Sequence, residues 1–291
     1  QSLPVTGTDS QGTAVTVADA SRILTLDSYG SLSRIVFELG LGEAVVARDV
    51  STDFPEAAHL PVVTENGHDL NAEAILDAAP TVILTDTSLG PWDTILQMRD
   101  AGIPVVVVDS HRSLESVGSL IQQVGAALGV PERAAALAAR STASTEAKVA
   151  QIAAIAPADP ARKLRMMFLY VRGQSGVYYL FGEESGADSL IDALGGIDVA
   201  GEIGWTGMRP ITDEALVQAN PDLLIMMSKG LESVGGVDGL LEHLPAVAQT
   251  DAGRHRRVVD MADTDVLSFG PASADVLDAL AVAVYAPGAA G

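Results

Sequence analysis

A tyrosine and an arginine stand two residues apart, directly after an apolar run in the second half of the chain. The run Met166–Leu169 is typical of a buried strand, and Gly173 and Gly176 indicate a loop beyond it. Tyr170 and Arg172 would then lie at the carboxyl end of a strand, where open α/β sheets bind ligands, with their side chains on one face. A guanidinium beside a phenol favours the phenolate, which is a good ligand for ferric iron, including haem iron.

The plain alternative is that Tyr170 belongs to a core wall and that Arg172 is a surface charge, since both residue types are common at half-buried strand ends. This stretch alone does not decide between the two interpretations. Either one requires the strand to end near Tyr170.

A histidine in the first half of the chain is a second candidate ligand. His68 lies in a polar segment, residues 48–70, that we expect to be a long loop, and loops of this length are usually functional or disordered. His59 shares the segment and is the fallback ligand. The alternative for His68 is a solvated loop residue. The other histidines have charged or helical surroundings and are expected at the surface: His111, His243 and His255.

Composition limits the classes of function. The net charge of −21 argues against nucleic acid or an anionic membrane surface as a partner. The absence of cysteine excludes thiolate metal sites, thiol catalysis and disulfides. No apolar stretch is long and uncharged enough to span a membrane. A length of 291 residues with 48% hydrophobic residues predicts two folded domains.

The order of predicted elements indicates an α/β protein. The first half begins with a predicted hairpin of residues 15–17 and 22–26. Predicted helices follow, from Ser31, from Asn71 and over 92–100. They alternate with predicted strands over 44–47, 81–84 and 104–108. In the second half, strands over 166–171, 198–200, 222–227 and 257–261 alternate with helices over 185–194, from Thr212 and over 272–285. Such alternation predicts parallel sheets flanked by helices.

One long helix separates the two halves. Residues 132–155 contain neither Gly nor Pro, and their length exceeds what a crossover between strands needs. We therefore predict a helix that connects two lobes. The expected organisation is a flexible tail over 1–13, an N-terminal lobe over 14–112, a linker region with the interlobe helix over 113–162, and a C-terminal lobe over 163–291.

An internal repeat supports the two lobes. Residues 71–84 align with residues 212–225, and the helix, the glutamate in its first turn and the proline before the next strand all recur. A second match aligns Leu39-Gly40 with Leu194-Gly195. Two related lobes leave a cleft between their strand ends, which is a natural ligand site. His68 and Tyr170 could face each other across it, and the alignment places His68 opposite Arg209.

The chain resembles the substrate-binding proteins of bacterial ABC importers whose two lobes are joined by one long helix. Within this class III fold, it is similar to the haem-binding lipoproteins of Gram-positive haem uptake. The resemblance covers nearly the whole chain from about Val15. The most specific matches are STDFP at 51–55, LPVV and NGH within 60–68, LYVRG at 169–173, VYYLFG at 177–182, SGADSLI at 185–191 and KGLESVGGVDGLL at 229–241.

The resemblance implies a site and a cargo. In the family, a histidine of lobe one and a tyrosine of lobe two are the axial ligands of ferric haem b. An arginine two residues after the tyrosine donates a hydrogen bond to it. His68, Tyr170 and Arg172 match these three positions. We expect Arg209 near a haem propionate and Met227 in the cleft wall, with Trp205, Phe181 and Val177 as further wall residues.

The resemblance also implies partners and a location. In the family, one glutamate on each lobe forms salt bridges with the permease, and Glu73 and Glu214 match by the repeat. The expected partners are haem, a haem ABC permease with its ATPase, and surface proteins that donate haem; the protein itself is expected to be a monomer. The expected location is the outer face of the cytoplasmic membrane of a Gram-positive bacterium, by a lipid anchor, although the lipid-bearing cysteine is not in this sequence.

Two other interpretations remain open from the sequence. The same fold could carry a ferric siderophore or cobalamin instead of haem. In a different class, the chain could be a two-lobed metal-dependent enzyme, with Asp263 and Asp265 joined by His68 or His255 as ligands. No HExxH, Walker lysine, GxSxG or complete dinucleotide fingerprint is present, so we expect a protein that is not an enzyme.

Overall fold

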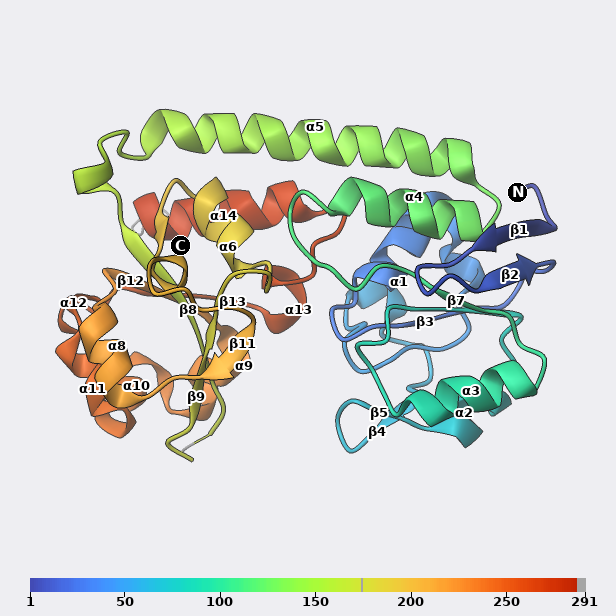
Figure 1. The fold of residues 1–291 in the computed structure, drawn as a ribbon, viewed down its shortest axis with the longest axis horizontal. Coiled ribbons are helices and arrows are strands. Elements are labelled where there is room, and N and C mark those ends of the chain that lie inside the picture. The colour runs from blue at the N-terminus through green and yellow to red at the C-terminus, as the bar shows by residue number, and fades with distance from the viewer. Residues whose placement is uncertain (174, 287–291) are drawn as a thin grey trace. The chain divides into compact units, whose positions relative to one another are not determined.

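The computed structural model describes residues 1–173 and 175–286. Residue 174, in the loop predicted after Tyr170, and residues 287–291, the end of the predicted C-terminal lobe, lie outside the described residues. The chain forms two compact units, each with its own sheet (Figure 1). Unit 1 comprises residues 1–110, 116–143 and 268–272, and unit 2 comprises residues 111–115, 144–267 and those from 273 onward.

Unit 1 is built on a parallel sheet with the strand order β3-β6-β7. The strands are β3 (Ile23–Leu26), β6 (Val82–Thr85) and β7 (Val105–Val107). Helices cover both faces of this sheet: α1 (Ser31–Val36) and α4 (Val117–Ala127) on one, and α2 (Ala72–Asp77) and α3 (Trp92–Asp100) on the other (Figure 1). Because both faces are covered, β3 and β6 are buried along their whole length.

The N-terminal segment differs from the prediction. Residues 1–13, expected to be a flexible tail, contain β1 (Val5–Thr8), which pairs antiparallel with β2 (Ala14–Val17). The predicted hairpin between residues 15–17 and 22–26 is wrong, because β3 instead pairs parallel with β6. The Asp9 carboxylate fixes the turn between β1 and β2 by accepting from the backbone N–H groups of Gln11 and Thr13.

The polar segment 48–70 is more ordered than the predicted loop. It contains a 3₁₀ turn at Pro55–Ala57, a bridge between Arg48 and Val62, and a hairpin of β4 (Thr64–Glu65) and β5 (Asp69–Leu70). The predicted strand over residues 44–47 is reduced to a single bridge from Val45 to Ile23, because a turn of 3₁₀ helix, Gly42–Ala44, precedes it.

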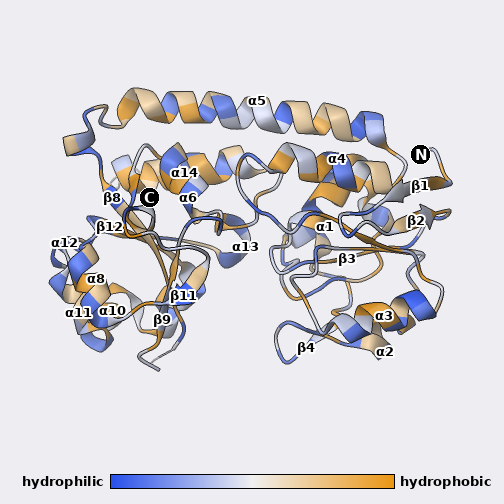
Figure 2. Ribbon diagram, viewed as in Figure 1, coloured by the Kyte–Doolittle hydropathy of each residue, from blue (hydrophilic) through white to orange (hydrophobic). Residues whose placement is uncertain are grey.

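The predicted long helix is present as α5 (Pro131–Ile155), which has 25 residues. It passes from unit 1 into unit 2 after Ala143. Hydrophilic residues occur all along it, interspersed with hydrophobic ones (Figure 2). The linker begins later than predicted, since α4 belongs to unit 1.

Unit 2 contains a mixed sheet with the strand order β11-β9-β8-β12-β13, and β10 (Ile197–Asp198) pairs with β8. The parallel strands β8 (Arg165–Val171), β12 (Leu223–Met227) and β13 (Val258–Met261) were predicted. Two antiparallel strands were missed, β9 (Tyr178–Phe181) and β11 (Met208–Pro210). The predicted strand over 198–200 is also wrong in part, because Val199 begins a short helix, α7 (Val199–Glu202), capped by the Asp198 side chain.

Helices cover the unit 2 sheet on both faces (Figure 1). On one side lie α6 (Ala187–Ala193) and α14 (Ser273–Tyr285). On the other lie α8 (Asp213–Ala219), α10 (Gly236–His243), α11 (Pro245–Gln249) and α12 (Asp251–Arg254). Two further helices follow β12 and β13: α9 (Ser228–Ser233) and α13 (Asp263–Val266). None of the described helices is long and apolar enough to cross a membrane.

An arginine at the start of each unit's first parallel strand shows that the repeat is structural. In unit 1, the Arg22 guanidinium donates to the carbonyls of Ala79, at 2.8 Å, and Ala78, at 2.6 Å, at the end of α2. The Arg22 carbonyl accepts from Thr81 N–H at 2.8 Å. A cation that binds the last carbonyls of a helix satisfies groups that have no partner inside the helix.

Arg165 repeats this arrangement in unit 2. Its guanidinium donates to the carbonyls of Asn220, at 2.8 Å, and Ala219, at 2.9 Å, at the end of α8, and its carbonyl accepts from Asp222 N–H at 2.8 Å. Asn220 and its counterpart Ala79 both have positive φ, 45° and 46°. The predicted repeat is therefore confirmed down to its backbone conformation.

Candidate functional site

Tyr170 is the next-to-last residue of β8, as the apolar run predicted. Side chains alternate across a strand. Leu169 and Val171 are buried in the core that the sheet shares with α8, α10 and α11. Tyr170 points to the opposite face and is only half-buried, so its hydroxyl-bearing ring lies at the rim of the sheet rather than in the core.

Aromatic neighbours hold the Tyr170 ring. The antiparallel register places Tyr179 of β9 directly opposite, with the ring centroids 6.1 Å apart. Phe181 presents its edge to Tyr170 at 6.2 Å and an interplanar angle of 88°, and it packs on the buried Phe168 at 5.0 Å. Edge-to-face pairs at these distances are favourable, so the position of the phenol is set by a ring cluster anchored in the core.

Four half-buried side chains form a row on this face of the sheet at its carboxyl edge. Tyr179 lies opposite Tyr170, and Met227 lies opposite Met261 of β13. The register of β12 with β8, extended by two residues, places Met227 beside Tyr170. We call Tyr179, Tyr170, Met227 and Met261 the rim row. The rim row consists of two aromatic rings and two polarisable thioethers. It is therefore suited to a flat, apolar ligand that has an atom to which the Tyr170 oxygen can bind.

Two of the four rim-row residues, Tyr170 and Met227, were predicted from the sequence. Met227 was predicted in the cleft wall, and the alternation along β12 directs its side chain to the same face of the sheet as Tyr170. Tyr179 and Met261 were missed as neighbours, because β9 pairs antiparallel with β8 and β13 follows β12 only after four intervening helices. The alternation in VYYLFG, which buries Tyr178 and Leu180 and leaves Tyr179 half-buried, was the signal for β9.

Arg172 is exposed and follows the last residue of β8. Gly173, with φ of 62°, turns the chain just after it. Its N–H donates to the Ser233 hydroxyl at 2.8 Å, which ties the start of this loop to α9. The predicted strand end and loop are thus present; the partnership of Arg172 with Tyr170 remains a prediction.

Arg209 lies on the edge strand β11, opposite Leu180 in the register with β9. Its guanidinium stacks on the Trp205 ring at 4.7 Å from the centroid, a favourable cation–π distance. The Trp205 indole N–H donates to the Leu180 carbonyl at 3.1 Å. Arg209 is exposed and belongs to the same sheet as Tyr170, and the stacking on Trp205 positions its guanidinium.

His68 lies in unit 1, at the tip of the β4–β5 hairpin, and it is exposed. Asn66 and Gly67 form the turn with φ of 49° and 93°, the left-handed region that Asn and Gly tolerate best. The hairpin thus presents an imidazole to solvent on a short, defined turn. His59, the fallback ligand, is exposed close to the Pro55–Ala57 turn.

Unit 1 has a different group where unit 2 has Tyr170. Asp27 follows β3 at the same distance from Arg22 as Tyr170 lies from Arg165. Its carboxylate is fully buried and accepts from the backbone N–H, at 3.1 Å, and the hydroxyl, at 2.9 Å, of Ser31 at the start of α1. This position is therefore fully buried in unit 1 and half-buried in unit 2.

A second buried carboxylate, Asp49, lies against Asp27. It accepts from the N–H groups of Asp27, at 3.0 Å, and Thr52, at 2.9 Å. Burial, followed by repulsion from Asp27, raises the pKa of Asp49 to about 8, more than those hydrogen bonds lower it. The folded state thus keeps a proton on this carboxyl at pH values where the unfolded chain has lost it.

We therefore expect the free energy of unfolding to fall as pH rises from about 4 to about 8, because over that window the folded state binds more protons than the unfolded state. Asp49→Asn should flatten this slope. Urea unfolding at about pH 5 and pH 8 measures the difference, with Asp19→Asn, at an exposed carboxylate, as the control that retains it. An unchanged slope in Asp49→Asn would show that Asp49 titrates normally.

The two glutamates of the repeat occupy matching positions. Glu73 is exposed in the first turn of α2, which begins after Asn71, whose side chain accepts from Ala74 N–H. Glu214 is exposed in the first turn of α8, where the Thr212 side chain makes the equivalent bond. The structure thus places one exposed glutamate per unit on equivalent helices, as predicted.

The ligand set of the enzyme hypothesis is not assembled. Within the described part of the chain, no three His, Cys, Asp or Glu side chains are grouped so that they could hold a metal ion, and this includes Asp263 and Asp265. The Asp263 carboxylate instead accepts from Lys229 N–H at 3.2 Å, next to the end of β12.

The family model described as "Periplasmic binding protein" matches residues 28–264. The crystal structure of the heme binding protein HmuT is 42% identical, with a TM-score of 0.93, over 98% of this chain and 91% of that one. The periplasmic heme-binding protein RhuT from Roseiflexus sp. RS-1 is 37% identical, with a TM-score of 0.83, over 92% of this chain and 98% of that one.

A curated relative, the ABC transporter substrate-binding lipoprotein YvrC of Bacillus subtilis, whose function is uncharacterized, is 26% identical over 97% of this chain and 86% of its own length. The proteins similar to this chain are thus binding and transport proteins with the same two-sheet α/β architecture. Since the family model spans most of the sequence, the chain belongs to the periplasmic binding protein family.

Proposed function

We propose that this protein binds haem outside the cytoplasm and delivers it to an ABC permease for haem and iron uptake. The observation that carries the proposal is the rim row in a chain that is 42% identical to a heme binding protein over nearly its whole length. The row offers a half-buried phenol between an aromatic and an apolar neighbour, which suits one face of a porphyrin and a bond to its iron.

Structures of HmuT variants support the choice of ligands. Variants of that protein replace a tyrosine, a histidine and an arginine by alanine. The tyrosine and the arginine are two positions apart, as Tyr170 and Arg172 are here. The histidine precedes the tyrosine by a separation within three residues of that from His68 to Tyr170.

In this proposal, Tyr170 and His68 are the two axial ligands, one from each unit. A phenolate paired with an imidazole favours ferric iron, so the proposed cargo is haem in the ferric state. The proposed type is haem b. Arg172 stabilises the phenolate by a charge-assisted hydrogen bond, and Arg209 binds a propionate. Met227 contacts the porphyrin face beside Tyr170.

Titration of the purified protein with hemin tests the cargo. A Soret band that shifts and saturates near one or two equivalents supports haem, and the spectrum of the protein as isolated shows whether haem is carried along. The same fold could carry a ferric siderophore or cobalamin, so both are titrated in parallel by fluorescence quenching. Tight binding of either one, with hemin binding only weakly, would overturn the proposed cargo.

Removal of His68 should change the spin state more than the affinity. Tyr170 would remain as the only protein ligand in His68→Ala, so the iron should become five-coordinate or take up water. We expect a high-spin charge-transfer band and a loss of affinity smaller than that of Tyr170→Phe. His59→Ala is the matched control on the same segment and should keep the wild-type spectrum. A wild-type spectrum in His68→Ala, together with a changed spectrum in His59→Ala, would assign the ligand role to His59 instead.

Removal of Arg172 should make haem retention more sensitive to acid. Without the guanidinium, the phenolate takes up a proton more readily, so haem release on acidification should begin at higher pH in Arg172→Ala. Loss of a charge-assisted bond of this kind costs about 1.5–3 kcal/mol where it is shielded from water. Arg172→Lys, which keeps the charge, should recover part of the acid resistance. Identical acid profiles for wild type and Arg172→Ala would count against this partnership.

The location and partners follow from the same relationship. Membership of the periplasmic binding protein family, together with similarity to an ABC transporter substrate-binding lipoprotein, supports a place outside the cytoplasm and a permease–ATPase complex as partner. We propose further that a lipid anchors the protein to the outer face of the membrane of a Gram-positive bacterium, that surface proteins donate haem to it, and that it acts as a monomer that catalyses no reaction. Glu73 and Glu214 are the proposed permease contacts.

A further inference from the structure

An apolar side chain accompanies the proposed docking glutamate in each unit. In unit 1, Leu76 lies three residues after Glu73 on α2, so both side chains lie on one helix face, and Leu76 is 46% exposed. The repeat places Val217 of α8 three residues after Glu214 in unit 2. Val217 is half-buried and packs in part against the core of unit 2, so the two units share the spacing of the acid and the apolar residue, while Leu76 is the more exposed of the two.

The unit 2 pair borders a groove. The groove lies between α8 and α11 and has a volume of about 580 Å³. Its acidic wall consists of Asp213 and Glu214, and its remaining lining is largely apolar or uncharged: Val217, Gln218, Pro245, Ala246 and Gln249. Such a groove suits an inserted side chain that is apolar along its length and positive at its end.

The acidic wall of the groove is held by the sheet. The hydroxyl of Tyr178, a buried residue of β9, donates to the Asp213 carboxylate. Burial, followed by this hydrogen bond, raises the pKa of Tyr178 above its ordinary value, because a buried phenol that donates to a carboxylate is favoured over a phenolate. This hydrogen bond ties Asp213, at the start of α8, to strand β9.

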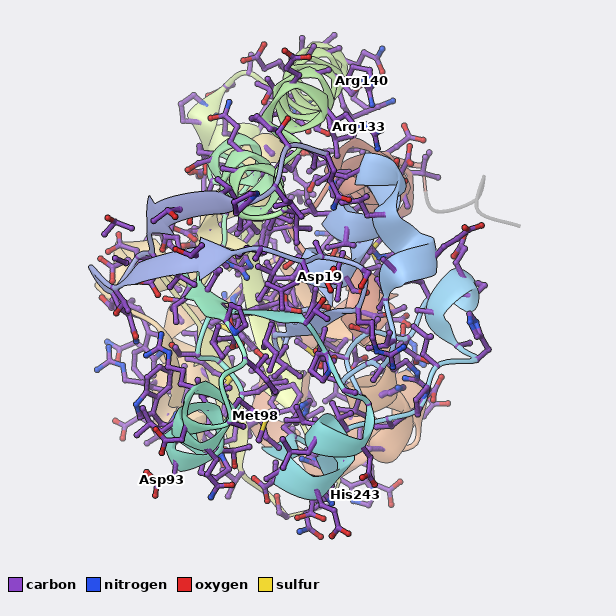
Figure 3. The ribbon with its side chains drawn as sticks, turned by 90° about the vertical axis from the view of Figure 1, so that its right-hand side faces the viewer. Asp19, Asp93, Met98, Arg133, Arg140 and His243 are labelled. Carbon is purple, nitrogen blue, oxygen red and sulfur yellow. The ribbon has the colours of Figure 1, made fainter. Side chains whose placement is uncertain are left out.

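Unit 1 carries a second pair of an exposed acid and an exposed leucine. Leu96 of α3 is 40% exposed and lies three residues after the exposed Asp93, which repeats the acid–leucine spacing on the helix next to α2. Figure 3 shows Asp93 on the outer side of α3 and Met98 on its inner side. The faces of α2 and α3 thus carry leucines flanked by carboxylates, although a helix covering a sheet needs apolar residues only on its inner side.

We propose that Leu76 and Val217 are apolar anchors of the docking surface, each seated against one of two like subunits of the permease beside the contact of its glutamate. This inference rests on the proposed permease docking. Duplicated acid–apolar pairs fit a partner that offers two like faces, each with a cationic side chain next to an apolar one. Charge complementarity favours that occupant, because this protein carries a net charge of −21 and an acid at each anchor. The apolar contact then supplies affinity, and the charges supply orientation.

The test is docking of the haem-loaded protein on its permease–ATPase complex in nanodiscs. Leu76→Ser with Val217→Thr removes apolar surface, and Val217→Thr keeps the shape of the groove. We expect Kd to rise at least about tenfold, since burial of part of a leucine is worth on the order of one tenfold step. The salt dependence of Kd should match that of wild type, because no charge is lost. Ile155→Ser, at a 62% exposed position on α5, is the matched control and should leave Kd unchanged.

The outcomes separate this inference from the proposal on which it rests. Wild-type affinity of the Leu76/Val217 variant, with docking lost in Glu73→Arg/Glu214→Arg, would overturn the anchors and leave the glutamates in place. Wild-type affinity of both variants would overturn the docking surface itself. A steeper or shallower salt dependence in the Leu76/Val217 variant would show that the apolar residues act by shifting the carboxylates. An unchanged Soret spectrum and thermal melt confirm that each variant is folded and loaded.

Discussion

Tyr170→Phe should lose most of its bound ferric haem. The substitution removes the phenol oxygen and keeps the ring that packs against Phe181 and Tyr179. Replacement of a group that only supports a metal ligand already costs roughly 10–100-fold in affinity, so loss of the ligand itself should cost at least about 100-fold. Hemin titration and the rate of haem transfer to apomyoglobin measure this loss. Tyr170→Ala should lose haem to the same extent and loosen the ring cluster as well.

The structure supplies the control for this experiment. Tyr179 lies opposite Tyr170 on the same face of the sheet, whereas Tyr178 points to the other face and binds Asp213. Tyr179→Phe should therefore keep the wild-type spectrum, with at most a small change in affinity. If Tyr170→Phe keeps the wild-type spectrum instead, the ligand assignment is wrong, and Tyr179 rather than Tyr178 is the residue to test next.

The double substitution Glu73→Arg with Glu214→Arg should abolish haem transport and leave haem binding intact. Both carboxylates are exposed at the starts of equivalent helices, so reversal of their charge should cost the fold no more than about 1 kcal/mol for each helix terminus. Against cationic groups on the permease, the same reversal turns attraction into repulsion at two places. Haem-stimulated ATP hydrolysis by the reconstituted complex and haem uptake into vesicles are the measurements.

Exposed carboxylates elsewhere provide the comparison. Glu132 and Asp275 lie in the first turns of α5 and α14, so Glu132→Arg with Asp275→Arg makes the same change of charge away from α2 and α8. This control should transport haem normally. Normal transport by the Glu73/Glu214 variant would remove these residues from the docking site, and loss of its Soret band would show that the repeat has been placed on the wrong face.

The sequence by itself determined the elements whose signals are local. The apolar run before Tyr170 predicted β8, because a strand buried on both faces has no polar alternation. The stretch without Gly or Pro predicted α5 almost to the residue. The repeat was visible because a capping residue, a first-turn glutamate and a proline are each fixed by helix and strand geometry, and the structure extended it to Arg22 and Arg165.

Tertiary structure alone decided which of these residues meet. Pairing between strands depends on register and on returns of the chain that local pattern does not record, so Tyr179 and Met261 joined Tyr170 and Met227 in the rim row only in the folded sheet. The N-terminal residues became a strand because β2 supplied a partner, although their composition is typical of a tail. The burial of Asp27 and Asp49 side by side is likewise a property of packing: a carboxylate in a sequence is expected in water, and only its neighbours determine whether it keeps its proton.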